Sequence, residues 1–153
     1  MNKWIGKRTT GCRHLAQFEP EEILAQRRPW EDETKIVFHA DDGRRLKVRM
    51  NSIRYHLFAR SPVCACCGRV GTVMMLDVHS VMYSRAHFNL YAVEGNKLIL
   101  MTRDHIVPRS RGGHDVLDNL QTMCTTCNNA KGDKDVTLAE LRAIVRGEEL
   151  VAA

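Results

Sequence analysis

Two C-x-x-C pairs constrain this 153-residue chain more than any other feature of its sequence. Cys64 and Cys67 form the first pair, Cys124 and Cys127 form the second, and 56 residues lie between them. Four thiolates suit a tetrahedral structural Zn²⁺, and a two-residue spacer lets both sulfurs of a pair turn onto one ion. The sequence therefore predicts a structural zinc that joins two remote parts of the chain.

The other two cysteines leave alternatives open. Cys66 lies inside the first pair and could compete for the metal, whereas Cys12 is expected to be a free thiol. A redox C-x-x-C is a second interpretation, but it explains one pair and leaves the other without a role. Residues 1–18 contain no apolar segment of a secretory signal, although they lack acids as transit peptides do. We expect reduced thiols and a cytoplasmic location.

Composition excludes several classes of protein. Hydrophobic residues make up 44% of the chain and charged residues 27%, which is typical of a globular domain and excludes general disorder. No apolar run is long enough to span a bilayer, so no membrane partner is expected. Lys and Arg total 23 against 18 Asp and Glu, and this net charge of +5 is a weak indication of a polyanionic partner.

Positive charge is concentrated in residues 35–60, which hold seven basic and two acidic side chains. Arg45, Lys47 and Arg49 alternate in a β-prone run, so they project from one face of the expected strand. Such a face suits contact with a phosphate backbone. The alternative is an ordinary solvated face whose intervening residues turn inward.

Local signals predict a mixed α+β order of elements. Turn residues between β-prone runs predict two hairpins, and capping residues before apolar periods predict the helix starts. The expected strands are 35–40 with 44–50, and 86–93 with 97–102. The expected helices begin near Pro20, at Asn51 or Ser52 (ending at Arg60), near Thr125 (ending near Lys131), and after a capping box of Thr137 and Glu140.

The segment 103–134, RDHIVPRSRGGHDVLDNLQTMCTTCNNAKGDK, combines polar groups of a second kind. Asp104 and Asn128 offer oxygen donors that suit Mg²⁺ or Mn²⁺ rather than a thiophilic ion. A neutral histidine beside such an ion can take a proton from water, and His105 is adjacent to Asp104. Because adjacent strand residues face opposite ways, Asp104 and His105 reach one phosphate only if the strand ends in a turn.

The strings DHIVPRSRGG, DNL and C-x-x-C-N-x-x-K-G resemble the HNH (ββα-metal, His-Me finger) endonuclease family, in its subset with two C-x-x-C pairs. The resemblance covers roughly residues 61–134. It implies an α+β fold with a ββα-metal core and a structural zinc, preceded by an N-terminal β-hairpin and short helix. The expected organisation is an N-terminal arm with a DNA-binding extension (1–60), a nuclease core (61–136) and a C-terminal helix and tail (137–153).

The resemblance also implies a role for each motif residue. His105 is the general base, and Asn119 holds the loop that orients it. Asp104 and Asn128 are ligands of a catalytic Mg²⁺ or Mn²⁺. Asn128 departs from the family pattern, which usually has histidine there, and it favours these hard ions. The expected zinc ligands are Cys64, Cys67, Cys124 and Cys127. His114 and Asp115 could add a ligand from the loop, but we expect them to be solvated or structural.

These roles imply a metal-dependent endonuclease that hydrolyses DNA phosphodiester bonds, by nicking or by double-strand cleavage. The side chains expected to contact DNA are Arg45, Lys47, Arg49, Arg109, Arg111 and Lys131. Small free-standing members of the family are often phage-encoded, so a phage-infected host is one expected source. The alternative is a non-catalytic zinc-stabilised module that binds nucleic acid or protein. The stretch 68–103 is either a substrate-contacting insertion or a longer hairpin arm.

Overall fold

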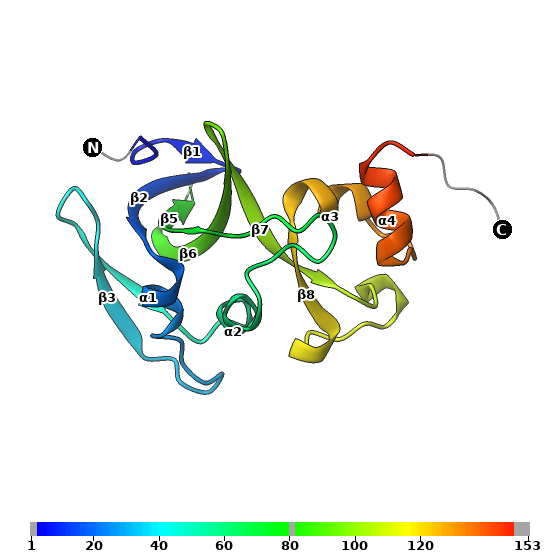
Figure 1. Cartoon of the computed structure of the whole chain (residues 1–153). Coiled ribbons are helices and arrows are strands. Elements are labelled where there is room, and N and C mark those ends of the chain that lie inside the picture. Colours follow the sequence, from blue (N-terminus) through cyan, green and yellow to red (C-terminus); the bar gives the residue numbers. More distant parts are fainter. Residues whose placement is uncertain (1–2, 80–81, 149–153) are drawn as a thin grey trace.

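The computed structural model describes residues 3–79 and 82–148, which form a mixed α+β fold (Figure 1). The strands are β1 (Arg8–Thr9), β2 (Cys12–Phe18), β3 (Lys35–His39), β4 (Arg45–Arg49), β5 (Val73–His79), β6 (Met82–Glu94), β7 (Lys97–His105) and β8 (Leu120–Cys124). The helices are α1 (Pro20–Leu24), α2 (Ile53–Arg60), α3 (Thr125–Lys131) and α4 (Leu138–Val145), with short 3₁₀ turns η1 (Arg109–Arg111) and η2 (Leu117–Asn119). None of these helices is long and apolar enough to cross a membrane.

Strand β7 connects the two parts of the molecule. The main sheet has the order β1-β2-β5-β6-β7-β8 with antiparallel neighbours, and β3 and β4 form a separate hairpin. Residues 97–100 of β7 pair with β6, whereas residues 101–105 pair with β8. The same strand therefore runs from the larger N-terminal part into a strand–strand–helix unit of β7, β8 and α3 (Figure 1).

The predicted hairpins and the predicted starts of α2, α3 and α4 are confirmed. Both expected hairpins form, and their last pairs are His39 with Arg45 and Glu94 with Lys97. Helix α2 begins after Ser52, whose hydroxyl accepts a hydrogen bond from the backbone N–H of Arg54. The expected capping box precedes α4, and α3 has the expected bounds.

Strands β1, β2, β5 and β8 were not predicted. Strand β5 is buried along nearly its whole length, so it lacks the alternation that marks a half-buried strand. Strand β2 pairs with β5 through an irregular register between His14 and Ala16, which breaks its period of two. Because β2 pairs with β5, the sheet crosses the expected boundary at residue 60.

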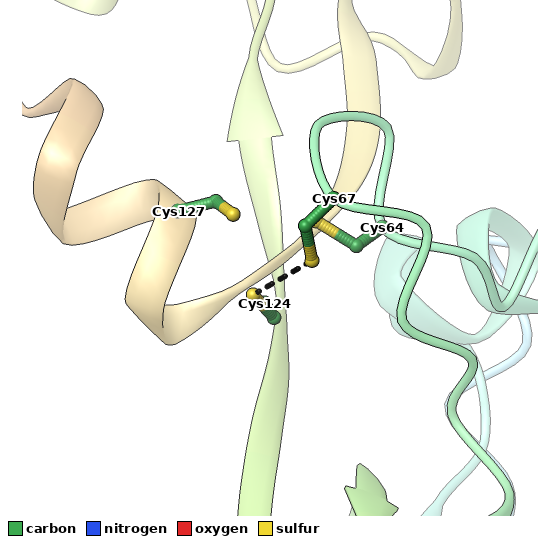
Figure 2. A group of neighbouring side chains, drawn as sticks. All are labelled: Cys64, Cys67, Cys124 and Cys127. Atoms are coloured by element: carbon green, nitrogen blue, oxygen red, sulfur yellow. Dashed lines mark hydrogen bonds between the residues drawn. The ribbon is translucent and has the colours of Figure 1, made fainter. Parts of the chain in front are cut away.

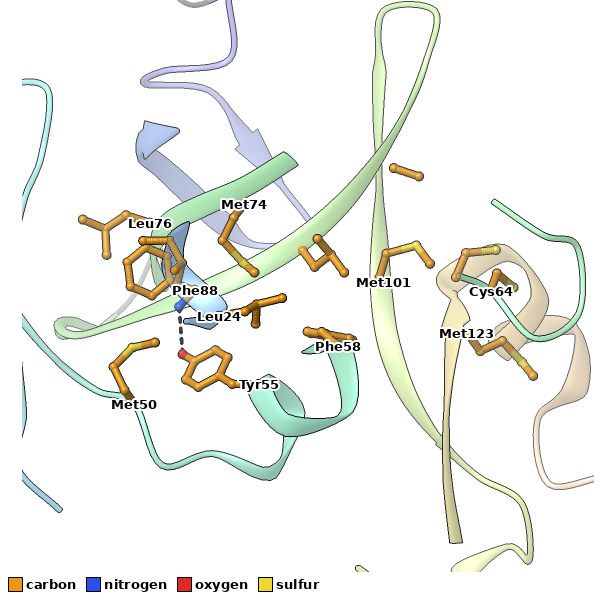
Figure 3. Packing of buried hydrophobic residues seen from close by; sticks show 14 of the residues in the cluster. Leu24, Met50, Tyr55, Phe58, Cys64, Met74, Leu76, Phe88, Met101 and Met123 are labelled. Atoms are coloured by element: carbon orange, nitrogen blue, oxygen red, sulfur yellow. Dashed lines mark hydrogen bonds between the residues drawn. The ribbon is translucent and has the colours of Figure 1, made fainter. Parts of the chain in front are cut away.

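One hydrophobic cluster extends through both parts of the molecule (Figure 3). It contains Phe58 of α2 and Phe88 of β6, and it continues to Met101 of β7 and Met123 of β8. The hydroxyl of Tyr55 accepts the backbone N–H of Phe88 at 3.1 Å, which satisfies a polar group inside the core. Cys64, Cys124 and Cys127 belong to the same cluster, so the cysteine group lies at one end of a continuous core.

Candidate functional site

The two cysteine pairs meet in space (Figure 2). Cys64 and Cys67 lie on the turn before β5, Cys124 ends β8, and Cys127 is in the first turn of α3. The four sulfur atoms all lie within 4.8 Å of one another, and those of Cys67 and Cys124 are 3.8 Å apart. A tetrahedral ion with Zn–S bonds of about 2.3 Å holds its sulfurs about 3.8 Å apart. The four-cysteine cluster therefore fits a structural zinc.

Arg69 adds positive charge beside this cluster. Its guanidinium lies 3.3 Å from the sulfur of Cys124 and 2.9 Å from a carboxylate oxygen of Glu94. Burial raises the pKa of the Cys124 thiol, but the backbone N–H of Cys127 and the Arg69 guanidinium outweigh it and lower the pKa to about 7. Burial raises the pKa of Cys127, which has no such cation. The thiol of Cys124 is thus more readily ionised for metal binding than that of Cys127.

The turn with the first cysteine pair is fixed from two sides. The backbone N–H of Ala65 donates to the carbonyl of Thr122 in β8 at 2.9 Å. Arg142 of α4 donates to the carbonyls of Cys66 at 2.9 Å and Ala65 at 3.0 Å. Cys66 is buried but lies outside the four-sulfur group. All six cysteines are free thiols.

A second constellation surrounds a cleft of about 350 Å³ between the end of β7 and α3. Asp104 and His105 come from the last two residues of β7, and Asn128 comes from α3. These three predicted site residues line the same cleft, together with Arg109 and Lys131. We call it the β7–α3 cleft.

The imidazole of His105 is held by a carboxylate that the sequence did not single out as functional. Its Nε2 atom contacts the carboxylate of Asp115, which also accepts from the guanidinium of Arg109. The hydrogen bond from His105, followed by that from Arg109, lowers the pKa of Asp115. No described residue binds Nδ1 of His105, so Nδ1 is the ring nitrogen left for a water or a substrate.

Asp104 is buried in an ion pair with Lys131. The ammonium of Lys131 lies 2.7 and 3.0 Å from the two carboxylate oxygens and 2.6 Å from the carbonyl of His105. Gln121 of β8 also donates to the carboxylate, at 2.9 Å. From the sequence we expected Lys131 to contact DNA phosphate, but its side chain is only 5% exposed and is paired with Asp104.

Asn128 presents a defined oxygen. Its Nδ2 donates to the hydroxyl of Thr102 at 2.7 Å, and this hydroxyl donates to the carbonyl of Met123, also at 2.7 Å. Because the Thr102 hydroxyl donates its proton to Met123, the hydroxyl oxygen can only accept a hydrogen bond from Asn128, and the Asn128 atom facing it must be Nδ2. Oδ1 of Asn128 therefore remains available as a metal ligand. This oxygen and the Asp104 carboxylate line the same cleft, and both are hard oxygen donors of the kind that Mg²⁺ and Mn²⁺ bind.

Asn119 lies outside the cleft and braces the loop beside it. Its Oδ1 accepts the backbone N–H of Val107 at 2.9 Å, and its Nδ2 donates to the carbonyls of Val107 and His114 at 3.2 and 3.0 Å. Gly113 packs against the same loop, and a Cβ there would lie 1.7 Å from the carbonyl oxygen of Val107. The tight loop after His105 therefore depends on this asparagine and this glycine.

The remaining predicted DNA-binding residues lie at the surface. Arg45, Lys47 and Arg49 are exposed on β4. Arg111 lies 3.2 Å from a carboxylate oxygen of Asp135, and Arg109 contacts Asp115. Both of these arginines keep more than half of their side-chain surface exposed.

The family model described as HNH endonuclease matches residues 94–134 of this chain. The matched segment contains β7, β8 and α3, and with them Asp104, His105, Asn119, Asn128 and the second cysteine pair. Neither a curated protein nor a solved structure gives a significant match. Residues 94–134 are thus similar to the HNH endonuclease family, and they contribute two of the four cysteines of a cluster able to hold zinc.

Proposed function

We propose that the protein is a metal-dependent HNH endonuclease that hydrolyses DNA phosphodiester bonds. The observation that carries the proposal is the β7–α3 cleft, where a histidine and two hard oxygen donors line one space. The match of residues 94–134 to the HNH endonuclease model supports the same activity. The strand–strand–helix unit of β7, β8 and α3 is then its ββα-metal core.

His105 acts as the general base in this proposal. Asp115 binds Nε2, so Nδ1 takes the proton from the attacking water. General base catalysis of this kind contributes roughly 10²- to 10⁴-fold to the rate. Asn119 and Gly113 keep the loop after His105 in place, and thereby the position of the imidazole.

Asp104 and Asn128 would hold a catalytic Mg²⁺ or Mn²⁺. When bound, such an ion neutralises charge that develops on the phosphoryl and leaving-group oxygens. Lys131 and Gln121 fix the direction of the Asp104 carboxylate, and Thr102 fixes that of the Asn128 amide. A structural zinc on the four cysteines would hold α3, which carries Asn128, against the strand that carries His105.

The ion pair of Asp104 favours a second candidate. Both of its carboxylate oxygens accept from Lys131, so a ligand ion must share or displace this ammonium. A zinc-stabilised module that binds nucleic acid or protein without cleaving it would need no such exchange. The cytoplasmic location and the phage origin expected from the sequence remain predictions under either function.

Cleavage of supercoiled plasmid in Mg²⁺ or Mn²⁺ tests the endonuclease. The wild type is expected to produce nicked or linear DNA, and His105→Ala is expected to lose at least about 100-fold of this activity. His79→Ala, a histidine substitution outside the β7–α3 cleft, is the matched control and should cleave like the wild type. If wild type and His105→Ala are equally active or equally inert, the endonuclease proposal fails.

A further inference from the structure

A second cleft, of about 770 Å³, lies between the β3–β4 hairpin, the start of α2 and strand β6. Six basic side chains line it: Lys35, Lys47, Arg49, Arg54, Arg85 and Arg103. No acidic residue is among the described residues that line it. We call it the basic cleft. Six cations around one concave surface repel one another, so this cleft favours an anionic occupant.

The fold gathers these cations from four elements, the β3–β4 hairpin, α2, β6 and β7. Lys35 and Arg49 are paired across the β3–β4 hairpin, and Lys47 lies two residues before Arg49 on the same face. Arg85 belongs to β6, within the stretch 68–103 for which the sequence left open a substrate-contacting insertion or a longer hairpin arm. Arg54 is already ordered, because it donates to Oδ1 of Asn89 at 3.0 Å and to the carbonyl of Phe88 at 2.8 Å.

Arg103 connects the basic cleft with the β7–α3 cleft. It lines both of them, and it lies two residues before His105 in β7, so the two side chains share a face of the strand. A small anion engages two or three cations at once, whereas this row of cations continues from the hairpin to the histidine. Its extent suits a polymer with regularly spaced negative charges.

We propose that the basic cleft binds the phosphate backbone of duplex DNA on one side of the bond to be cleaved, with Arg103 at the point where the backbone enters the β7–α3 cleft. This inference rests on the proposed function for the substrate and adds Lys35, Arg54, Arg85 and Arg103 to its binding surface. The hairpin, α2 and β6 then form a backbone clamp for the catalytic unit. Arg45, which is on the same strand but does not line the cleft, is peripheral to it.

Binding of a labelled duplex, measured by fluorescence anisotropy without added Mg²⁺ or Mn²⁺ at several salt concentrations, tests the clamp without any cleavage and leaves a structural zinc in place. The test variant is Lys47→Ala/Arg49→Ala/Arg85→Ala, which removes three exposed cations of the basic cleft. The control is Lys7→Ala/Arg8→Ala/Lys97→Ala, which removes three exposed cations outside it. Both variants should melt like the wild type because the substituted side chains are exposed.

Each phosphate contact contributes about 0.9 to the slope of log K against log salt. For the test variant, the plot of log K against log salt is therefore expected to be shallower by about 2.7, and the affinity at 0.1 M salt to be roughly 500-fold weaker. The control is expected to keep the wild-type slope. Equal losses in both variants would mean that only net charge matters and would overturn the clamp, as would a test variant with the wild-type slope. If the slope changes as expected but the plasmid is not cleaved, the clamp stands and the endonuclease fails.

Discussion

Lys131→Met tests the ion pair beneath the β7–α3 cleft. The side chains of Lys131 and Asp104 are only 5% and 6% exposed, and the ammonium lies within 3.0 Å of both carboxylate oxygens. Removing the cation leaves a buried carboxylate whose remaining side-chain partner is Gln121. Loss of one partner from a buried pair costs about 3–5 kcal/mol, so we expect the free energy of unfolding to fall by that amount.

For a chain of this size, about 1 kcal/mol corresponds to roughly 2–4 °C in Tm, so Lys131→Met should melt about 6–20 °C below the wild type. Thermal and urea unfolding, with zinc content measured in parallel, give the comparison. Asp104→Asn/Lys131→Met should be more stable than Lys131→Met alone, because no unpaired charge is left in the interior. A loss below about 1 kcal/mol in the single variant would refute the ion pair as a buried structural element.

Three further predictions concern the cysteine cluster, the support of the base and the partly buried His87. Cys127→Ser should lose bound zinc and cooperative unfolding, whereas Cys12→Ser should keep both; equal zinc content by atomic absorption would contradict the cluster. Asp115→Asn should lower the plasmid cleavage rate about 10- to 100-fold with little change in Tm, because the imidazole of His105 loses its orienting partner at an exposed position. Burial lowers the pKa of His87, so the unfolded state binds more protons and stability should fall, by at most about 1.4 kcal/mol per pH unit, as the pH drops below about 6.5. His87→Gln should remove this part of the pH dependence in urea unfolding, and an unchanged dependence would exclude His87 as its source.

The sequence predicted the features that depend on short-range signals. Capping residues gave the starts of α2 and α4, and turn residues gave both hairpins. The spacing of the cysteine pairs predicted a common site because a metal requires all four sulfurs together, even across 56 residues. For the hairpins and helix starts the signal lies in a few neighbouring residues, and for the cysteines it lies in the number of ligands that one metal ion requires.

Features that depend on pairing between remote segments were not predicted. The alternation of β5 is hidden because both of its faces are buried, and its partner β2 has an irregular register. The partner of Asp104 was not evident either, because a lysine one helical turn after Asn128 is equally compatible with solvent or a phosphate. Only the packing of α3 against β7 turns Lys131 inward to the carboxylate.

Strand β7 explains how a remote basic surface can act together with the candidate catalytic residues. Its first half pairs with β6, which carries Arg85, and its second half pairs with β8 beside the cysteine cluster. Side chains alternate along a strand, so Arg103 and His105 lie on one face of β7 and Asp104 lies on the opposite face, where it contacts Lys131. The register of β7 fixes both faces together. The pairing with β6 therefore sets the distance from the basic cleft to His105, and the pairing with β8 sets the distance from His105 to Asn128. The proposed endonuclease would need no flexible linker between DNA binding and catalysis, since one strand belongs to both clefts.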